Sequence, residues 1–203
     1  MLQVNELECV RGERKLFSGM NFELPPGGLL HLQGPNGSGK TSLLRMLAGL
    51  VLPASGEILW NGEPIKKLRE EFFANLTYLG HAPAIKDDLT ALENLYISGH
   101  LAGSPIEEDD AVQALRHMGL GGREDLPAKY LSQGQRRRVA LARLLVCQTK
   151  LWILDEPFTA LDKAAIQSLA GLIEQHLEQG GSAVLTTHQW VDIVGKHVKE
   201  LHL

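Results

Sequence analysis

The eight residues GPNGSGKT, from Gly34 to Thr41, constrain the fold of this 203-residue chain more than any other stretch. They fit the pattern G-x-x-x-x-G-K-[ST] and stand between an apolar run, GLLHLQ at 28–33, and the helical pattern KTSLLRMLAGL. In such a loop the glycines leave backbone N–H groups free to surround phosphate oxygens, and the helix N-terminus adds positive potential. The sequence therefore predicts a P-loop nucleotide site that follows a buried strand. We expect Lys40 to reach the β- and γ-phosphates and the Thr41 hydroxyl to bind Mg²⁺.

An acidic pair follows a second buried strand. In LWILDE the apolar residues predict burial, and Asp155 and Glu156 come directly after them. Asp155 is suited to hold the Mg²⁺ shell, and Glu156 is suited to accept a proton from water that attacks the γ-phosphate. A third strand, SAVLTTH at 182–188, ends in His188, which we expect to sense the γ-phosphate. The pattern favours hydrolysis over transfer to an acceptor.

Strand-like and helical segments alternate along most of the chain, which predicts an α/β fold with a mostly parallel sheet. The stretch LQVNELECV near the start is also interpreted as a strand, whereas helical patterns dominate between about Pro83 and Cys147. We expect one domain over residues 1–203, with a RecA-like P-loop NTPase core at 1–83 and 148–203 and an inserted α-helical subdomain at 84–147.

Composition excludes some classes of function. The net charge of −4 gives no general reason to expect a nucleic acid partner. No apolar run approaches the roughly 18 residues that span a bilayer, so membrane contact would pass through a partner. Cys9 and Cys147 are interpreted as buried free thiols, and Arg136, Arg137 and Arg138 as a solvated helix face.

Taken together, the motifs resemble those of the ATP-binding subunits of ABC transporters, in the order of that family. Gly34–Thr41 matches the Walker A loop, Leu151–Glu156 the Walker B strand and His188 the switch histidine. LSQGQ at 131–135 matches the signature motif, and ALD, ending at Asp162, matches the D-loop. The resemblance implies an ABC-type nucleotide-binding domain in which two copies pack head to tail. Each ATP then lies between the Walker A loop of one copy and the signature of the other.

The resemblance also implies which residues bind the cofactors ATP and Mg²⁺. The metal would be held by Thr41 and Asp155, while Glu156, His188 and His81 would form the catalytic group. The nucleotide-binding set combines the P-loop, one upstream residue and the signature: Gly34, Pro35, Asn36, Gly37, Ser38, Gly39, Lys40, Thr41, Ser42, Arg11, Ser132, Gly134 and Gln135. Three positions depart from the family pattern: Gln133 replaces a signature glycine, Arg11 a base-stacking aromatic, and His81 a glutamine.

The short chain and the stretches YLGHAPAIKDDLTALENL and GQRRRVALARLLV resemble the ATP-binding subunits of the bacterial exporters that serve cytochrome c maturation. That resemblance implies two polytopic membrane subunits, a haem chaperone reached through the complex, and a peripheral location on the cytoplasmic face of the inner membrane. The function would be haem export or release of the haem-loaded chaperone. We expect the segment APAIKDDLT after His81 to be the docking surface for the membrane subunits.

Several alternatives stay open at this point. The chain could serve an ABC transporter with a different cargo, or be an ABC-type ATPase without a transporter, although such proteins usually carry two cassettes or a long insertion. A small-molecule P-loop kinase would lack the LSxGQ helix and need a substrate lid. A clamp that does not hydrolyse ATP is disfavoured by the presence of Lys40, Asp155 and Glu156.

Overall fold

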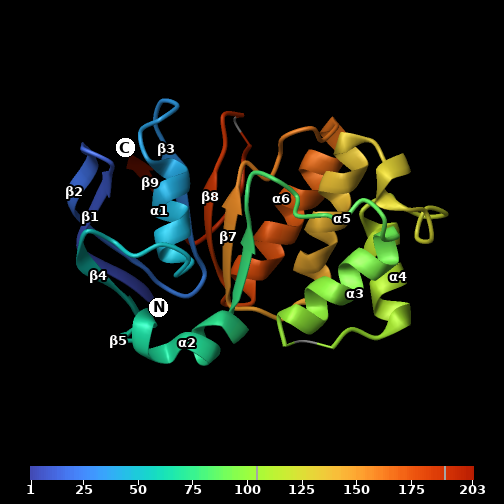
Figure 1. The fold of residues 1–203 in the computed structure, drawn as a ribbon, viewed down its shortest axis with the longest axis horizontal. Helices are drawn as coiled ribbons and strands as arrows, with labels where there is room; N and C mark the ends of the chain where they lie inside the picture. Colours follow the sequence, from blue (N-terminus) through green and yellow to red (C-terminus); the bar gives the residue numbers. More distant parts are fainter. Residues whose placement is uncertain (104, 190) are drawn as a thin grey trace.

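The computed structural model describes residues 1–103, 105–189 and 191–203, and its strands form two sheets (Figure 1). The first sheet is antiparallel and has the order β2-β1-β4-β5, from β1 (Leu2–Arg11), β2 (Arg14–Leu24), β4 (Ser55–Trp60) and β5 (Glu63–Pro64). The second is parallel and has the order β6-β7-β8-β3-β9, from β3 (Gly28–Gln33), β6 (Leu76–Leu79), β7 (Leu151–Asp155), β8 (Ser182–Thr186) and β9 (His197–His202).

The parallel sheet confirms the predicted fold class. The strands predicted at 28–33, 150–156 and 182–188 are β3, β7 and β8, and they are neighbours in the sheet. The stretch predicted as a strand near the start is β1, but its antiparallel partners β2 and β4 were not predicted. β1 and β2 form a local hairpin that turns at Gly12 and Glu13, whereas the pairing of β1 with β4 joins segments far apart in the chain, which periodicity within one segment does not reveal.

Helix α1 (Lys40–Leu47) lies between the two sheets, to the right of β1 and β2 in Figure 1. Its buried side chains, among them Leu43 and Met46, share one apolar cluster with residues of β1, β4 and one face of the parallel sheet. Helix α2 (Ile65–Ala74) adds the buried Phe72 to the same cluster. The helix that begins at the P-loop is therefore fixed on both sides by packing.

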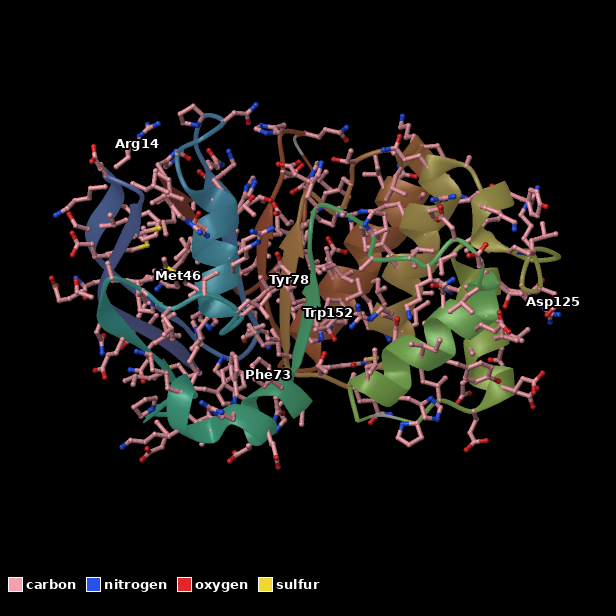
Figure 2. All side chains as sticks on the ribbon, in the orientation of Figure 1. Arg14, Met46, Phe73, Tyr78, Asp125 and Trp152 are labelled. Carbon is pink, nitrogen blue, oxygen red and sulfur yellow. The ribbon has the colours of Figure 1, made fainter. Side chains whose placement is uncertain are left out.

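Helices α5 (Gln133–Val146) and α6 (Lys163–Glu178) pack on the other face of the parallel sheet, and α3 (Ala91–Leu101) and α4 (Glu108–His117) pack against α5. Successive residues of β7 alternate between the faces, because Ile153 packs towards α1 while Trp152 and Leu154 pack towards these helices. Figure 2, in which Met46 and Trp152 are labelled, shows side chains on both sides of the sheet. The sheet is thus buried on both faces, as an almost continuously apolar strand predicts.

The segment 84–147 contains α3, α4, the short 3-10 helix η1 (Ala128–Tyr130) and α5, and no strand among its described residues, in agreement with its helical pattern. Its division from the core as a subdomain stays a prediction. Cys9 and Cys147 are buried free thiols, as predicted. Within the described part of the chain, no helix is both long and apolar enough to cross a membrane.

Candidate functional site

Four neighbouring parallel strands end at the same edge of the sheet, and the predicted motifs follow their carboxyl ends. The P-loop follows β3, Glu156 follows β7, His188 lies beyond β8, and His81 follows β6. The loops surround a cavity of about 490 Å³. Its lining combines ten predicted site residues with two others: Asn36, Gly37, Gly39, Lys40, Thr41, Ser42, His81, Asp155, Glu156 and His188, together with Leu16 and Thr159. This is where open α/β sheets bind their ligands.

The P-loop has the conformation that its glycines permit. The backbone φ is 143° at Gly34 and 114° at Gly39, values that disfavour other residues. A Cβ atom on Gly34 would lie 2.6 Å from the Leu203 carbonyl oxygen, so a side chain has no room there. The Lys40 Nζ donates to the carbonyl oxygens of Gly34 (2.7 Å) and Pro35 (3.1 Å). The Ser38 hydroxyl is buried without a hydrogen-bond partner among the described residues, and Ser38 does not line the cavity.

Hard oxygen ligands suited to Mg²⁺ lie beside the P-loop. The Thr41 hydroxyl donates to Asp155 Oδ2 at 3.0 Å, and the Asp155 side chain is buried. Hydroxyl and carboxylate oxygens fit the preference of Mg²⁺, which usually completes its shell with water and substrate phosphates. The described residues contain no cluster of three or more His, Cys, Asp or Glu side chains able to hold a metal without such additions.

Glu156 is held in an unusual backbone conformation, with φ at 52°. Its N–H donates to the Thr186 hydroxyl at 2.9 Å, and that hydroxyl donates in turn to Asp155 Oδ1 at 2.9 Å. The Glu156 Oε1 lies 3.5 Å from His188 Nε2, and the imidazole is more than half exposed while the carboxylate is largely covered. Left-handed backbone at a non-glycine residue costs free energy and persists where surrounding contacts fix it, often at functional sites.

The prediction of a solvated arginine face is wrong for Arg137. This side chain is 4% exposed, and its guanidinium donates to carbonyl oxygens after β6 and at the end of β7. Burial lowers the pKa of Arg137, while the nearby carboxylates of Asp155 and Glu156 oppose that shift. Arg136 and Arg138 instead form ion pairs at the surface, with Asp87 and Asp162.

The sequence did contain a signal for this burial. Arg137 shares a helix face with Ala140, Leu141 and Leu144, at the spacing i, i+3, i+4 and i+7, and all three of these are buried. This helix spacing was overlooked because two further arginines, Arg136 and Arg138, flank Arg137.

The signature residues lie at the start of α5, outside the lining of the cavity. Ser132 is the N-cap: its hydroxyl accepts from the Gln135 N–H at 3.3 Å, and the Gln135 side chain accepts from the Ser132 N–H at 2.9 Å. Ser132 and Gln133 are exposed, and Gly134 packs against the Ala160 carbonyl, where a Cβ would come within 2.6 Å. Arg11 is exposed at the end of β1 and also does not line the cavity. One chain therefore brings together only part of the predicted site.

Sequence reasoning missed three residues in or beside the cavity: Leu16 and Thr159 line it, and Thr186 contacts Asp155 and Glu156. Thr186 is the register partner of Asp155 in the sheet, and its position at the end of a strand was the available signal. Leu16 reaches the cavity from β2. β1 and β2 form a hairpin across Gly12 and Glu13, and this turn, which was not predicted, was the available signal for the position of Leu16.

Comparison with known proteins gives a consistent result. The model of the ABC transporter family matches residues 17–159. A relative from Nitrosospira multiformis is 63% identical over 98% of this chain and 96% of its own length, and one from Dechloromonas aromatica is 60% identical over the full length of both. Each of these is named cytochrome c biogenesis ATP-binding export protein CcmA.

Solved structures share the fold. A putative ABC transporter ATP-binding protein from Pyrococcus furiosus superposes with a TM-score of 0.84 at 24% identity, covering 98% of this chain and 96% of the other. A bacterial ABC transporter cassette solved as a dimer superposes with a TM-score of 0.86 at 22% identity, covering 100% and 94%. At these identities the likeness establishes the architecture alone.

Proposed function

This chain belongs to the ABC transporter family and, within it, to the cytochrome c biogenesis ATP-binding export proteins, and we propose that it powers a membrane complex for cytochrome c maturation by exporting haem or releasing a haem-loaded chaperone. It is an ABC-type ATPase. The main support for ATP hydrolysis is that Lys40, Asp155, Glu156 and His188 all line one cavity. A P-loop, a metal-binding carboxylate and a second carboxylate beside the γ-phosphate position form a hydrolytic site for ATP.

Each side chain has a distinct role in hydrolysis. Lys40 would leave its two carbonyl partners to bind the β- and γ-phosphates. Thr41 and Asp155 would hold Mg²⁺, which neutralises charge on the phosphates when bound. Glu156 would orient a water molecule and accept its proton, because its carboxylate faces the cavity from the end of β7. His188, adjacent to that carboxylate, would donate to a γ-phosphate oxygen.

The proposed working form is a head-to-tail dimer. Ser132, Gly134 and Gln135 lie at the start of α5 and do not line the cavity of their own chain, so they are available for the γ-phosphate of ATP bound by a second copy. ATP would favour the closed dimer because the γ-phosphate contacts both chains, and hydrolysis would remove that contact. Gln133, which replaces a signature glycine, is exposed, and so is Arg11, which stands at the expected base-stacking position.

We further propose that two polytopic membrane subunits dock on the segment 82–90, at the cytoplasmic face of the bacterial inner membrane. This segment is ordered by the buried Asn94, whose amide contacts the Lys86 N–H and carbonyl at 2.8 and 3.0 Å. The Lys129 N–H donates to the Asp87 carbonyl at 2.9 Å, close to the signature. A docked partner would therefore act on a firm loop between His81 and α3.

A pull-down tests this function. Glu156→Gln, tagged and loaded with ATP, should bind nucleotide but stall before hydrolysis, because the variant amide does not accept the proton of the attacking water. We expect it to recover two polytopic subunits from detergent-solubilised native membranes, whereas Lys40→Ala, which loses a phosphate contact, should recover them less well. Recovery of soluble partners or ribosomes alone would contradict the membrane assignment, and full hydrolysis by Glu156→Gln would contradict the assigned base.

A further inference from the structure

We propose that Arg137 is a positioning residue that ties the signature helix of one chain to its own hydrolytic carboxylate and to the His81 loop, so that the two ATP sites of a dimer respond together. The inference rests on the proposed function, in which the start of α5 faces the partner's ATP while Glu156 acts on the chain's own ATP. Arg137 itself touches neither the cavity nor the nucleotide position, because it is absent from the cavity lining and buried.

The three guanidinium nitrogens divide their hydrogen bonds between two loops. Nη1 donates to the carbonyl oxygens of Gly80 at 3.0 Å and His81 at 3.3 Å, both after β6. Nη2 donates to those of Asp155 and Glu156, each at 2.8 Å, and Nε donates to that of Pro157 at 3.5 Å. The planar fork of an arginine can serve both loops at once, whereas the single ammonium of a lysine is one point charge.

The hydrogen bond from Arg137 to the Glu156 carbonyl oxygen supports an unusual backbone conformation at Glu156. Its N–H is held by the Thr186 hydroxyl, and its carbonyl is held by Arg137, so both peptide groups around the left-handed φ of 52° have a fixed partner. Removing one partner would let the backbone relax towards a common conformation and move the carboxylate. Arg137 therefore acts on hydrolysis through the direction of Glu156.

Helix α5 connects Arg137 to Ser132, which the proposed dimer places at the ATP bound by the second copy. Ser132 caps this helix and Arg137 lies five residues further on, about 7.5 Å along the axis at 1.5 Å per residue. Nearby side chains of the helix, Val139 and Ala140, are buried, so the first turns are packed against their surroundings. A shift of Ser132 on contact with the partner's γ-phosphate would therefore be carried to the carbonyl oxygens of Gly80, His81, Asp155 and Glu156.

The buried charge has no direct ion pair, which explains why these carbonyls are needed. Among the described residues, no carboxylate lies within ion-pair distance of the Arg137 guanidinium, although it is 4% exposed. An unpaired buried cation is costly unless its donors are satisfied by hydrogen bonds. The five carbonyl contacts meet that need, and in doing so they fix the two loops relative to α5.

The test uses the complex purified from detergent-solubilised membranes and compares Arg137→Gln and Arg137→Lys with Arg123→Gln. Arg123 is the control, because it is an exposed arginine between α4 and η1 that does not line the cavity. We expect both Arg137 variants to lower kcat by about 10–100-fold while the KM for ATP stays within about twofold, as for a small misplacement of a reacting group. Arg123→Gln should leave kcat within about twofold of the wild type.

A double-mutant cycle separates positioning from general damage. If Arg137 acts through Glu156, Arg137→Gln should change the residual hydrolysis of Glu156→Gln by less than about twofold. An equal loss in both backgrounds, or full activity in Arg137→Lys, would overturn the inference. Binding of a fluorescent ATP analogue shows whether each variant is folded, and if Arg137→Gln does not bind it, the result for Arg137→Lys decides. Failure of Glu156→Gln to slow hydrolysis would instead count against the proposed function.

Discussion

Replacing Thr186 by valine removes one hydroxyl that serves two of the most important groups of the site. The hydroxyl donates to the buried Asp155 carboxylate at 2.9 Å and accepts from the Glu156 N–H at 2.9 Å. Valine has nearly the same shape, so packing of the fully buried side chain should change little. A hydrogen bond to a charged group contributes about 1.5–3 kcal/mol and a neutral one about 0.5–1.5 kcal/mol, so we expect a loss of about 2–4.5 kcal/mol in the free energy of unfolding.

Urea unfolding of the purified chain measures this loss, with an unchanged m-value showing that the same surface is exposed. Thr187→Val is the control, because the Thr187 hydroxyl contacts only the backbone of Gln189 in an exposed loop, and we expect a change below about 0.5 kcal/mol. If Thr186→Val is as stable as Thr187→Val, the hydroxyl does not support Asp155 and Glu156 as argued. The hydrolysis rate should fall together with stability, since the Asp155 carboxylate and the Glu156 backbone N–H each lose a fixed contact.

Three further substitutions test packing and pH dependence. Gly134→Ala places a Cβ 2.6 Å from the Ala160 carbonyl oxygen and should lower the free energy of unfolding by about 1–3 kcal/mol. Gly171→Ala is the control, because a Cβ at this position on α6 meets open space, and it should raise the free energy of unfolding by up to about 1 kcal/mol. The same urea titration measures both values. Burial lowers the pKa of His176, which stacks on Trp152, below the ordinary value for histidine. The unfolded chain therefore binds this proton at higher pH than the folded chain, so stability should fall as the pH drops through about 6.5, and His176→Phe should flatten that decline. An unchanged profile in His176→Phe would exclude His176 as the cause.

Local sequence predicted the parts of the site that depend on one segment. The P-loop and the strand that ends in Asp155 each form from short-range patterns of glycine and apolar residues, and the structure has both. The same holds for the order of the motifs, which led to the family. The N-terminal sheet was not predicted, because the pairing of β1 with β4 joins segments far apart in the chain and the hairpin turn at Gly12 and Glu13 between β1 and β2 was not identified. Leu16 reaches the cavity from this hairpin.

The arginines of α5 show what a local sequence pattern does not reveal. Three successive arginines look alike in the sequence, yet only Arg137 is buried. Its guanidinium donates hydrogen bonds to five carbonyl oxygens from two segments that lie far from α5 in the chain. Likewise, Thr186 gained its role because β8 lies beside β7 in the parallel sheet. The sequence by itself determined the phosphate-binding chemistry, since that chemistry resides in a contiguous loop. Only the tertiary structure decided which groups hold Glu156 in place, since hydrogen bonds between distant segments exist only after the sheet and helices have packed.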